Sequence, residues 1–403
     1  MTATLPSVKP LKLVVPNPAW AALPLFDRTG WKRVRFGDVV ENCNETCDPA
    51  EAGLERFVAM EHLEPGSLHV RSWGNVADGT TFTRRCRPGQ VLFGKRRAYQ
   101  RKVAVAEFEA VVSGDIYVLA PKDTQRLLPE LLPFLCLSER FFQHAVGTSA
   151  GSLSPRTNWS SLASFEFDLP PLDQQRRIAE VLWAVDEANE ANLAQLPEFK
   201  AYQQAVWDAH KTEKDVKTVR IGDVAVVANG STPSKAEDRY WTGGTFPWLP
   251  TGKVHDRFIT TGGEFITEAA LKERKARVFP RGSVLVAMIG QGKTRGSAAL
   301  MEIEASVNQN FACIVPRDIE SYYLFYALDF SYEALRRSSH GSNQEALNCS
   351  LVGNFPVPCA PRKRQEEIAA AMKDCERSQK AIETHCANSA TLLTEVINTI
   401  FPV

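Results

Sequence analysis

The sequence predicts a mixed α/β (α+β) protein in which two similar globular domains alternate with two long helices. Segments recur in the same order about 190 positions apart, each copy opens with short apolar runs, and each ends in a heptad-patterned stretch. A chain of 403 residues also exceeds one ordinary hydrophobic core. We therefore predict an arm, a domain, a helix, a second domain and a second helix, with the bounds 1–30, 31–172, 173–215, 216–361 and 362–403.

The N-terminal arm is rich in proline. Its first thirty residues hold five prolines and lack the apolar core of a signal peptide, which indicates an extended segment. No apolar run approaches the roughly 20 residues that span a bilayer, so we expect no membrane contact. The nine cysteines are scattered from Cys43 to Cys386, which favours reduced thiols in the cytoplasm. Cys43 and Cys47 lack a second pair at metal-ligand spacing, so a zinc site is the lesser alternative.

Four pairs of segments carry the repeat. The segment Trp31–Glu41 matches Val216–Val226, Arg87–Lys95 matches Pro280–Met288, and Gly114–Asp123 matches Gln309–Asp318, at offsets of 185, 193 and 195. At a loop-to-helix junction, Pro171, Gln175, Ile178 and Ala179 recur as Pro361, Gln365, Ile368 and Ala369, 190 positions later. Because the order is kept and the offsets drift by only a few residues, the chain is two copies of one unit.

Short apolar runs mark the strands of each domain. The runs "QVLFG" and "AVVSGDIYVLA" in the first copy, and "SVLVAMIG" and "FACIVP" in the second, are bounded by Gly, Pro, Asn and Asp. Each domain should therefore combine strands and turns with a few short helices.

Two heptad seams predict the long helices. The first helix should run from near Gln174 to about His210, and the second follows Pro361; six of nine and eight of ten seam positions are apolar. The best partner for each narrow seam is the other helix, with packing against an ordinary core as the alternative. Pro197 should kink or break the first helix near Leu193. The polar seam residues Asn189, Asn192 and Gln379 are candidates for fixing the register.

The charges are unevenly distributed although 47 basic and 47 acidic residues cancel. Between Arg84 and Lys102 there are eight basic residues and no acid, the matching window Arg277–Arg295 has four and no acid, and Asp173–Lys200 has six acids against three bases. A solvated charged face is the alternative, but a basic loop at the same place in both copies favours nucleic-acid binding. Long polar side chains of such loops reach phosphates and base edges in a major groove.

One segment approximates a phosphate-binding loop. "AMIGQGKT", Ala287–Thr294, would match if its first Ala were Gly. Such a loop needs a helix N-terminus directly after the Lys, whereas the following "RGSAALMEIEASV" is strand-like and the first copy lacks the pattern. Nucleotide binding is thus the minor interpretation. His-Glu-x-x-His, Gly-x-Ser-x-Gly and the methyl-transfer signature are also missing, which favours a reader without catalysis or a metal of its own.

The segment Leu169–Ala188, "LPPLDQQRRIAEVLWAVDEA", resembles the junction between recognition domain and helix in the specificity subunits of type I restriction–modification systems. Ile221–Val254 is similar to the start of many target-recognition domains of that family, and the resemblance covers nearly the whole chain after the arm. The second junction departs from the pattern, since Cys359 and Ala360 stand where the first has Leu169 and Pro170.

The resemblance implies antiparallel helices, a pseudo-twofold relation of the two domains, and one half of a split double-stranded DNA target for each domain. It also implies partners: two methyltransferase subunits that carry S-adenosylmethionine, and two restriction (helicase-nuclease) subunits that use ATP and Mg. This chain would hold no cofactor itself. A duplicated chain with divergent loops reads two different half-sites, where a dimer of identical subunits reads a palindrome.

The candidate DNA contacts follow from the two basic loops. In the first copy they are Lys95, Arg96, Arg97, Tyr99, Gln100, Arg101 and Lys102; in the second they are Gln291, Lys293, Thr294 and Arg295. Secondary candidates are Ser231, Thr232, Ser234, His340, Ser342, Asn343 and Gln344. Two rival functions remain: a single-chain methyltransferase or nuclease with its own recognition part, and a DNA-binding regulator or scaffold without restriction partners.

Overall fold

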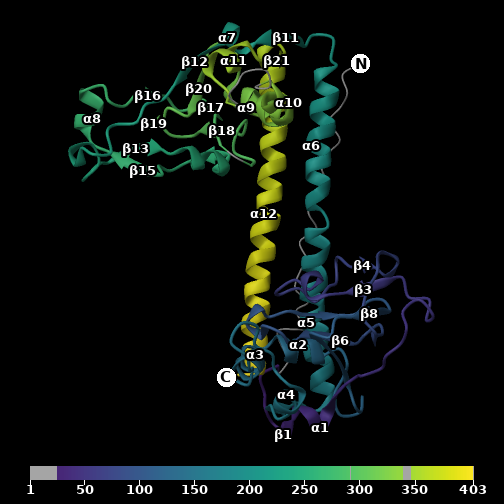
Figure 1. The fold of residues 1–403 in the computed structure, drawn as a ribbon. Helices are drawn as coiled ribbons and strands as arrows, with labels where there is room; N and C mark the ends of the chain where they lie inside the picture. Colours follow the sequence, from purple (N-terminus) through teal and green to yellow (C-terminus); the bar gives the residue numbers. More distant parts are fainter. Residues whose placement is uncertain (1–24, 291, 339–345, 403) are drawn as a thin grey trace. The chain divides into compact units, whose positions relative to one another are not determined.

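The computed structural model describes residues 25–290, 292–338 and 346–402 and forms two compact units (Figure 1). Unit 1 comprises the described residues up to Ala194 together with those from Ile382 onward, and unit 2 spans Gln195–Ala381. Each unit therefore holds one globular domain and one part of the C-terminal helix α12 (Arg362–Ile400). Unit 1 also holds the helix that follows its domain, and unit 2 holds the helix that precedes its domain. The predicted arm lies almost entirely outside the described residues.

Three sets of strands build the domain of unit 1. One four-stranded sheet has the order β2-β9-β6-β7, a second has the order β4-β3-β8-β5, and β1 pairs with β10. The strands are β1 (Lys32–Arg35), β2 (Val40–Asn42), β3 (Arg56–Val58), β4 (Gly74–Asn75), β5 (Arg84–Cys86), β6 (Val91–Gly94), β7 (Val103–Val105), β8 (Ala110–Val112), β9 (Ile116–Pro121) and β10 (Glu166–Leu169). The helices are α1 (Phe36–Val39), α2 (Leu132–Leu137), α3 (Glu139–Gly147) and α4 (Trp159–Ala163).

Unit 2 repeats this topology with one additional strand, β14. Its sheets have the orders β12-β20-β17-β18-β14 and β15-β13-β19-β16, and β11 pairs with β21. The strands are β11 (Lys217–Arg220), β12 (Ala225–Asn229), β13 (Phe246–Leu249), β14 (Phe258–Ile259), β15 (Glu264–Ile266), β16 (Val278–Phe279), β17 (Val284–Ala287), β18 (Ala298–Met301), β19 (Ala305–Val307), β20 (Phe311–Pro316) and β21 (Pro356–Cys359). The helices are α7 (Ile221–Val224), α8 (Glu268–Lys272), α9 (Ser321–Phe330), α10 (Tyr332–Arg337) and α11 (Cys349–Asn354). The predicted duplication and mixed α/β class are confirmed.

The repeat extends to single hydrogen bonds. Gly89, before β6, and Gly282, before β17, adopt φ of 84° and 87°, and each donates its N–H over 2.8 Å to a carbonyl of the neighbouring strand region. A left-handed turn of this kind favours glycine, which explains why both copies keep it. Asn158 and Asn348 cap α4 and α11 by accepting the N–H groups of Ser161 and Leu351. Matching backbone geometry thus underlies the sequence repeat.

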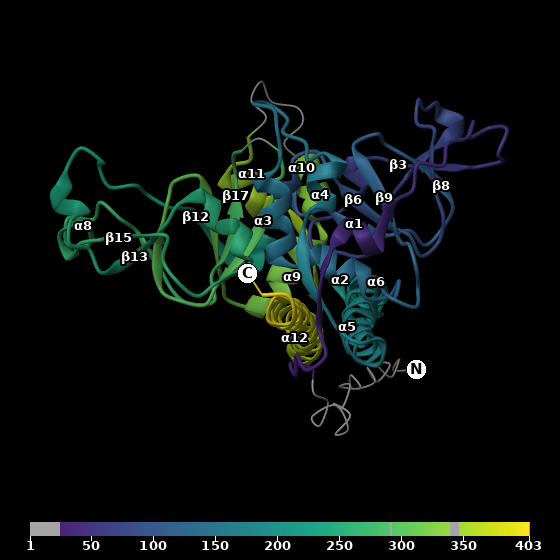
Figure 2. The same cartoon turned by 90° about the horizontal axis from the view of Figure 1, so that it is seen from below.

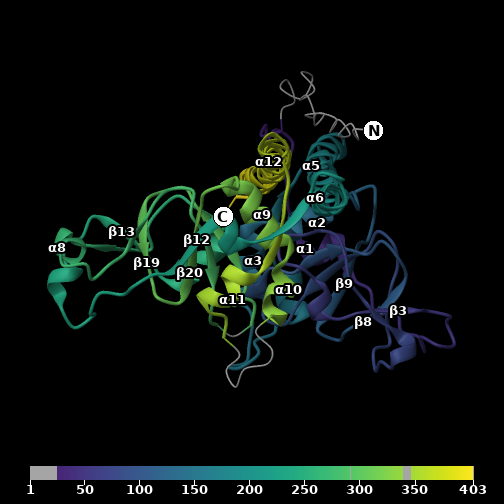
Figure 3. The ribbon, with the colours of Figure 1, turned by 90° about the horizontal axis from the view of Figure 1, so that it is seen from above.

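The central strands of both units are buried on both faces. All four residues of β6 and all four of β17 are buried, which matches their uninterrupted apolar runs. In unit 1, α2 lies between the sheet containing β6 and helix α5 (Leu172–Leu193), and β3 and β8 lie on the far side (Figures 2 and 3). In unit 2, α9 takes the place of α2, and α8 with β13 and β15 lies farthest from α12.

The predicted first long helix is broken, as expected for Pro197. Helix α5 ends at Leu193, and α6 (Leu196–Lys211) begins with Pro197 in its first turn, where the missing N–H is tolerated. In unit 1, Ile178 shares a core with Ile400. Farther along α5, the backbone oxygen of Asn189 lies 3.9 Å from Sγ of Cys386. The two helices are therefore antiparallel within unit 1.

Unit 2 shows the same antiparallel arrangement. Glu213, just after α6, pairs with Arg364 near the start of α12, with 2.5 Å between Nη2 and Oε1, whereas Phe199 lies opposite Cys375. The predicted seam of α12 is buried at Ile368, Met372, Cys375, Ile382, Cys386 and Ile400. On α5 and α6 the buried set also includes Asp186, Trp207 and His210, which lie outside the predicted seam.

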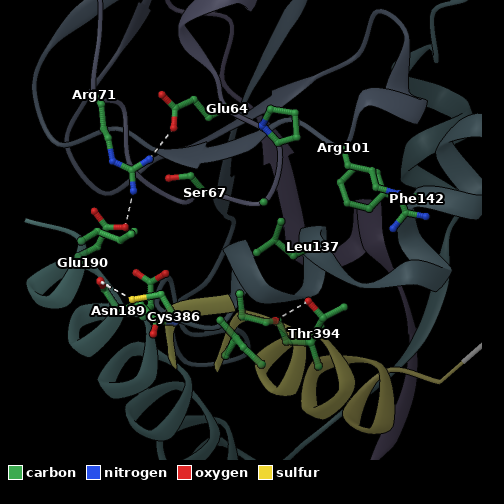
Figure 4. A pocket seen from close by; sticks show the side chains of 17 residues that line it. Glu64, Ser67, Arg71, Arg101, Leu137, Phe142, Asn189, Glu190, Cys386 and Thr394 are labelled. Atoms are coloured by element: carbon green, nitrogen blue, oxygen red, sulfur yellow. Dashed lines mark hydrogen bonds and ion pairs between the residues drawn. The ribbon is translucent and has the colours of Figure 1, made fainter. Parts of the chain in front are cut away.

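A pocket lined by both polar and apolar side chains lies between the domain of unit 1 and its helices (Figure 4). Arg71 reaches across it, donating to Glu64 at 2.6 Å and pairing with Glu190 of α5. Beside it, His69 lies between Glu107 at 2.6 Å and Asp186 of α5 at 2.8 Å. Ion pairs as well as apolar contacts therefore fix this domain on its helix. Within the described part of the chain, no helix combines the length and apolar composition needed to cross a membrane.

Candidate nucleic-acid interface

The first basic loop connects β6 to β7 and contains a tight 3₁₀ turn, Ala98–Gln100. Arg97 and Arg101 flank the turn, and both adopt left-handed backbone conformations with φ of 54° and 55°. Such conformations cost free energy in a non-glycine residue and indicate a loop whose shape is imposed by its surroundings. Ala98 is buried under the turn, whereas 55% of Tyr99 is exposed. The turn therefore presents Tyr99 outward, and Gln100 beside it is half-buried.

Several basic side chains of this loop form hydrogen bonds or ion pairs with residues from elsewhere in the domain. Arg96 donates to Asp115 at 3.2 Å and to Ser154 at 3.0 Å, Arg101 pairs with Glu139 at 2.5 Å, and Lys102 donates to the Met60 carbonyl at 2.6 Å. The acids that pair with part of this basic window therefore come from segments outside it. Upstream, Arg85 and Arg87 are likewise paired with Glu45 and Glu109.

Lys95 and Arg97 remain the cations best placed to act on a ligand. Lys95 lies over the Tyr117 ring, 4.8 Å from its centroid, and burial together with repulsion from Arg84 lowers the pKa of its ammonium. Arg97 contacts only neutral groups among its described hydrogen-bond partners, namely the Leu153 carbonyl and the Ser154 hydroxyl at 3.4 Å each. Its positive charge is therefore not cancelled by these contacts.

A neighbouring loop, Thr148–Arg156, was not predicted from the sequence. Arg97 N–H donates to the Pro155 carbonyl at 2.7 Å, and Thr157 N–H donates to the Lys95 carbonyl at 3.1 Å. Arg156 pairs with Asp115 at 2.8 Å, so this loop and the basic loop share one acid. The sequence does hold a signal for this loop. The loop stands just before the helix-capping Asn158, and the predicted segment His340–Gln344 of the second copy stands just before the equivalent Asn348.

In the second copy the corresponding loop joins β17 to β18. Arg336 of α10 anchors this loop by donating hydrogen bonds to the carbonyls of Gly292 at 2.5 Å and Arg295 at 3.1 Å. Tyr332 donates to the Lys293 carbonyl at 2.9 Å. The Lys293 side chain is exposed, and Thr294 lies 3.2 Å from His255. Arg295, in contrast, is only 7% exposed and so contributes little to the exposed surface.

The phosphate-loop resemblance of this segment is not supported by its geometry. Strand β18 begins at Ala298, after a turn, and no helix follows Lys293 in this described stretch. Without a helix N-terminus, the arrangement of N–H groups that binds phosphate in such loops is absent here.

The secondary candidates divide into two groups. Ser231 accepts the Arg277 N–H at 2.9 Å and its carbonyl accepts Trp248 Nε1 at 3.1 Å, the Ser234 carbonyl accepts Trp241 Nε1 at 3.0 Å, and Thr232 bonds to Gln309. These residues therefore brace the domain, and only Ser234 is exposed. The other group, His340, Ser342, Asn343 and Gln344, lies outside the described residues, as does Gln291.

Within each domain a set of neighbouring loops lies together, and we call this set the loop edge of that unit. In unit 1 it consists of the β6–β7 loop, the turn Ser113–Asp115 and the loop Thr148–Arg156. In unit 2 it consists of the β17–β18 loop and the turn Asn308–Asn310. The Lys95 N–H donates to the Asp115 carbonyl at 2.9 Å, and the Met288 N–H donates to the Asn310 carbonyl at 2.8 Å. One backbone frame thus carries different side chains in the two copies.

The chemistry of the two loop edges is that of binding. They offer guanidinium, ammonium, amide and phenol groups, which suit phosphates and base edges. In the described parts of the chain, no group of three or more His, Cys, Asp or Glu side chains is arranged to hold a metal ion. A duplicated α/β domain with polar, partly basic loops beside a helix pair therefore defines a class of two-site binding proteins.

Comparisons with known proteins agree with this class. The family model described as "Type I restriction modification DNA specificity domain" matches residues 29–198 and 213–391. A specificity subunit of the type I restriction enzyme MjaIX from Methanocaldococcus jannaschii is 32% identical over 171 residues, which are 41% of this chain and 39% of that protein. The EcoR124I/EcoR124II specificity subunit from Escherichia coli is 20% identical over 160 residues, 39% of this chain and 40% of its own. The chain thus spans about two fifths of the length of these relatives.

Solved structures show the same fold. The S subunit of a type I restriction–modification system from M. genitalium aligns with a TM-score of 0.59 at 13% identity and covers 93% of this chain and 96% of that one. A chain from a structural study of complex assembly in the type I R-M system aligns with a TM-score of 0.56 at 19% identity, covering 92% and 96%. The chain belongs to the type I restriction–modification DNA specificity family.

Proposed function

We propose that this chain selects the DNA target of a type I restriction–modification complex. Each loop edge reads one half of a bipartite double-stranded target, and the helices separate the two halves. The observation that carries this proposal is the loop edge itself: the backbone bonds of Lys95 and Met288 are equivalent, yet the exposed side chains differ between the copies. A common frame with divergent contacts is suited to reading two different half-sites.

The partners of the proposed complex supply its catalysis. Two methyltransferase subunits would carry S-adenosylmethionine, and two restriction subunits would use ATP and Mg, all acting on DNA in the cytoplasm. The chain itself would be non-catalytic and hold no cofactor. Family membership and the fold support this division of labour.

The test is sequence-resolved adenine methylation of the source genome, with and without this gene. We expect methylation at one split motif to disappear when the gene is deleted and to return when it is restored. If the methylome is unchanged while the methyltransferase partners are expressed, the proposal is wrong. Calorimetry of the purified chain with S-adenosylmethionine separates the enzyme alternative, since measurable binding would indicate a methyltransferase.

A further inference from the structure

Leu153 is an apolar side chain held out into solvent at the loop edge of unit 1. It is 88% exposed, the most exposed large hydrophobic residue in the described part of the chain. Its neighbours Gly151, Ser152 and Ser154 are small or polar, so the leucine stands alone at the tip of its loop. A single exposed leucine is common on protein surfaces, but the loop that carries Leu153 is held by hydrogen bonds on both sides.

The brace consists of two arginines and a backbone pair. Arg97 donates to the Leu153 carbonyl at 3.4 Å, and Arg96 donates to the Ser154 hydroxyl at 3.0 Å. Below the tip, Ala150 and Arg156 exchange two backbone hydrogen bonds of 3.0 Å. These contacts lie on both sides of the tip and hold the leucine outward.

The surroundings of Leu153 indicate what it contacts. Arg97, whose charge no carboxylate cancels among its described bonds, lies beside it and suits a phosphate or a guanine edge. In a major groove the one apolar group on a base edge is the thymine 5-methyl, and apolar side chains read it by direct contact. Such a contact would bury Leu153 only when DNA is bound.

We propose that Leu153 reads the 5-methyl group of one thymine in the half-site contacted by unit 1. This proposal rests on the proposed function and adds to it a residue and the base that it recognises. The contact would act with Arg97, which positions the tip from the basic loop. Insertion of Leu153 between base pairs is the competing mode, and the test separates the two.

The test measures binding of the full-length chain to duplexes that carry the sequence motif identified by the methylation experiment. In these duplexes each thymine is replaced in turn by deoxyuridine, which removes only the 5-methyl group. For the wild type we expect one position, in one half-site, at which the replacement weakens binding roughly fourfold, the value for about one buried methyl group. Leu153→Ala should weaken binding to the unmodified duplex roughly tenfold and should abolish the effect of that deoxyuridine. Leu392→Ala, an exposed leucine on α12, is the matched control and should behave as the wild type.

Other outcomes overturn the proposal. A deoxyuridine effect that persists unchanged in Leu153→Ala would do so, as would a wild type that responds to deoxyuridine at no position. A 2-aminopurine probe that brightens with the wild type but not with Leu153→Ala would show unstacking, and therefore insertion. If the wild-type chain does not distinguish the motif from a scrambled duplex, the proposed function fails as well. If the wild type binds the motif specifically and Leu153→Ala binds it with the same affinity, only this inference is refuted.

Discussion

Gln175 and Gln365 make the same hydrogen bonds at the start of two helices, although 190 positions separate them. Gln175 donates to the Pro170 carbonyl at 2.8 Å and accepts the Leu128 N–H at 2.9 Å. Gln365 donates to the Ala360 carbonyl at 2.7 Å and accepts the Glu320 N–H at 2.7 Å. Both are 1% exposed. Each glutamine joins the helix, the preceding loop and the domain, which explains why the junction survives in both copies.

Gln175→Ala and Gln365→Ala should each destabilise their own unit, because buried backbone groups lose their partners. We expect a loss of about 1–3 kcal/mol in the free energy of unfolding. Hydrogen exchange checks this locally: the Leu128 amide should exchange faster in Gln175→Ala, and the Glu320 amide in Gln365→Ala. The exposed Gln125→Ala is the control. Unchanged exchange at both amides would contradict a bridging role.

Arg97→Met and Lys293→Met should weaken DNA binding and its salt dependence. Each removes one cation of a loop edge and keeps the aliphatic stem, so the slope of log K against log salt should fall by about 1. Titrations between low and moderate salt measure it. Arg33→Met is the control, since Arg33 lies on β1 and pairs with Glu166 and Asp168. Equal slopes for all variants would remove these residues from the DNA interface.

His69 and His210 should give the two units opposite pH dependence. Burial lowers the pKa of His69, but the hydrogen bonds to Glu107 and Asp186, with the charges of Asp186 and Glu190, outweigh it and raise the pKa above the ordinary value of 6.5. The folded state therefore binds the proton more tightly. The resulting stabilisation is complete below the unfolded pKa and is lost as the pH rises through the folded one. The difference between wild type and His69→Gln should be larger at pH 6 than at pH 9, in urea unfolding of unit 1.

For His210 the sign is reversed. Burial lowers its pKa, Glu213 opposes this shift, and the ring lies 2.8 Å from the Tyr323 hydroxyl. The unfolded chain binds the proton more tightly, so unit 2 should lose stability as the pH falls through about 6.5. His210→Gln should reduce that loss, and the exposed His385→Gln should not. A unit 2 transition that is independent of pH between 7.5 and 5.5 would contradict the buried neutral imidazole.

Gly230→Ala should disrupt the loop edge of unit 2. A Cβ there would lie 2.0 Å from the Val307 carbonyl oxygen and 2.5 Å from that of Asn308, so the backbone beside the turn Asn308–Asn310 must move. We expect destabilisation of unit 2, measured by thermal unfolding, and weaker DNA binding. Gly252→Ala is the control, because nothing lies within 4 Å of the added Cβ. Wild-type stability and affinity in Gly230→Ala would show that the turn can yield.

Much of the fold could be predicted because its signals are local. The runs that became β6, β9, β17 and β20 are continuous and apolar, and Pro197 marked the break between α5 and α6. The repeat added what one copy could not, since segments that match in the same order at nearly the same offset identify a duplicated domain. The prediction of the apolar seam was incomplete. Asp186 and Trp207 lie outside the predicted seam and are nevertheless buried, because each helix also packs against a globular domain.

The candidate site was harder to predict, because a linear window contains no information about partners that lie elsewhere in the chain. The basic run Arg84–Lys102 has no acid of its own, yet Asp115 and Glu139 come from later segments and pair with Arg96 and Arg101. Arg295 was expected on the surface and is buried. The loop Thr148–Arg156 was missed because it lacks a basic run.

The sequence by itself determined the duplication, the mixed α/β class, the order of domains and helices, and the two basic loops, since each depends on periodicity or on neighbouring residues. Only the tertiary structure decided which cations stay available and which residue stands at the tip. Charge pairing and burial depend on distances in space, so Arg97 and Leu153 became distinguishable from Arg96 and Arg295 only when segments distant in sequence were brought together.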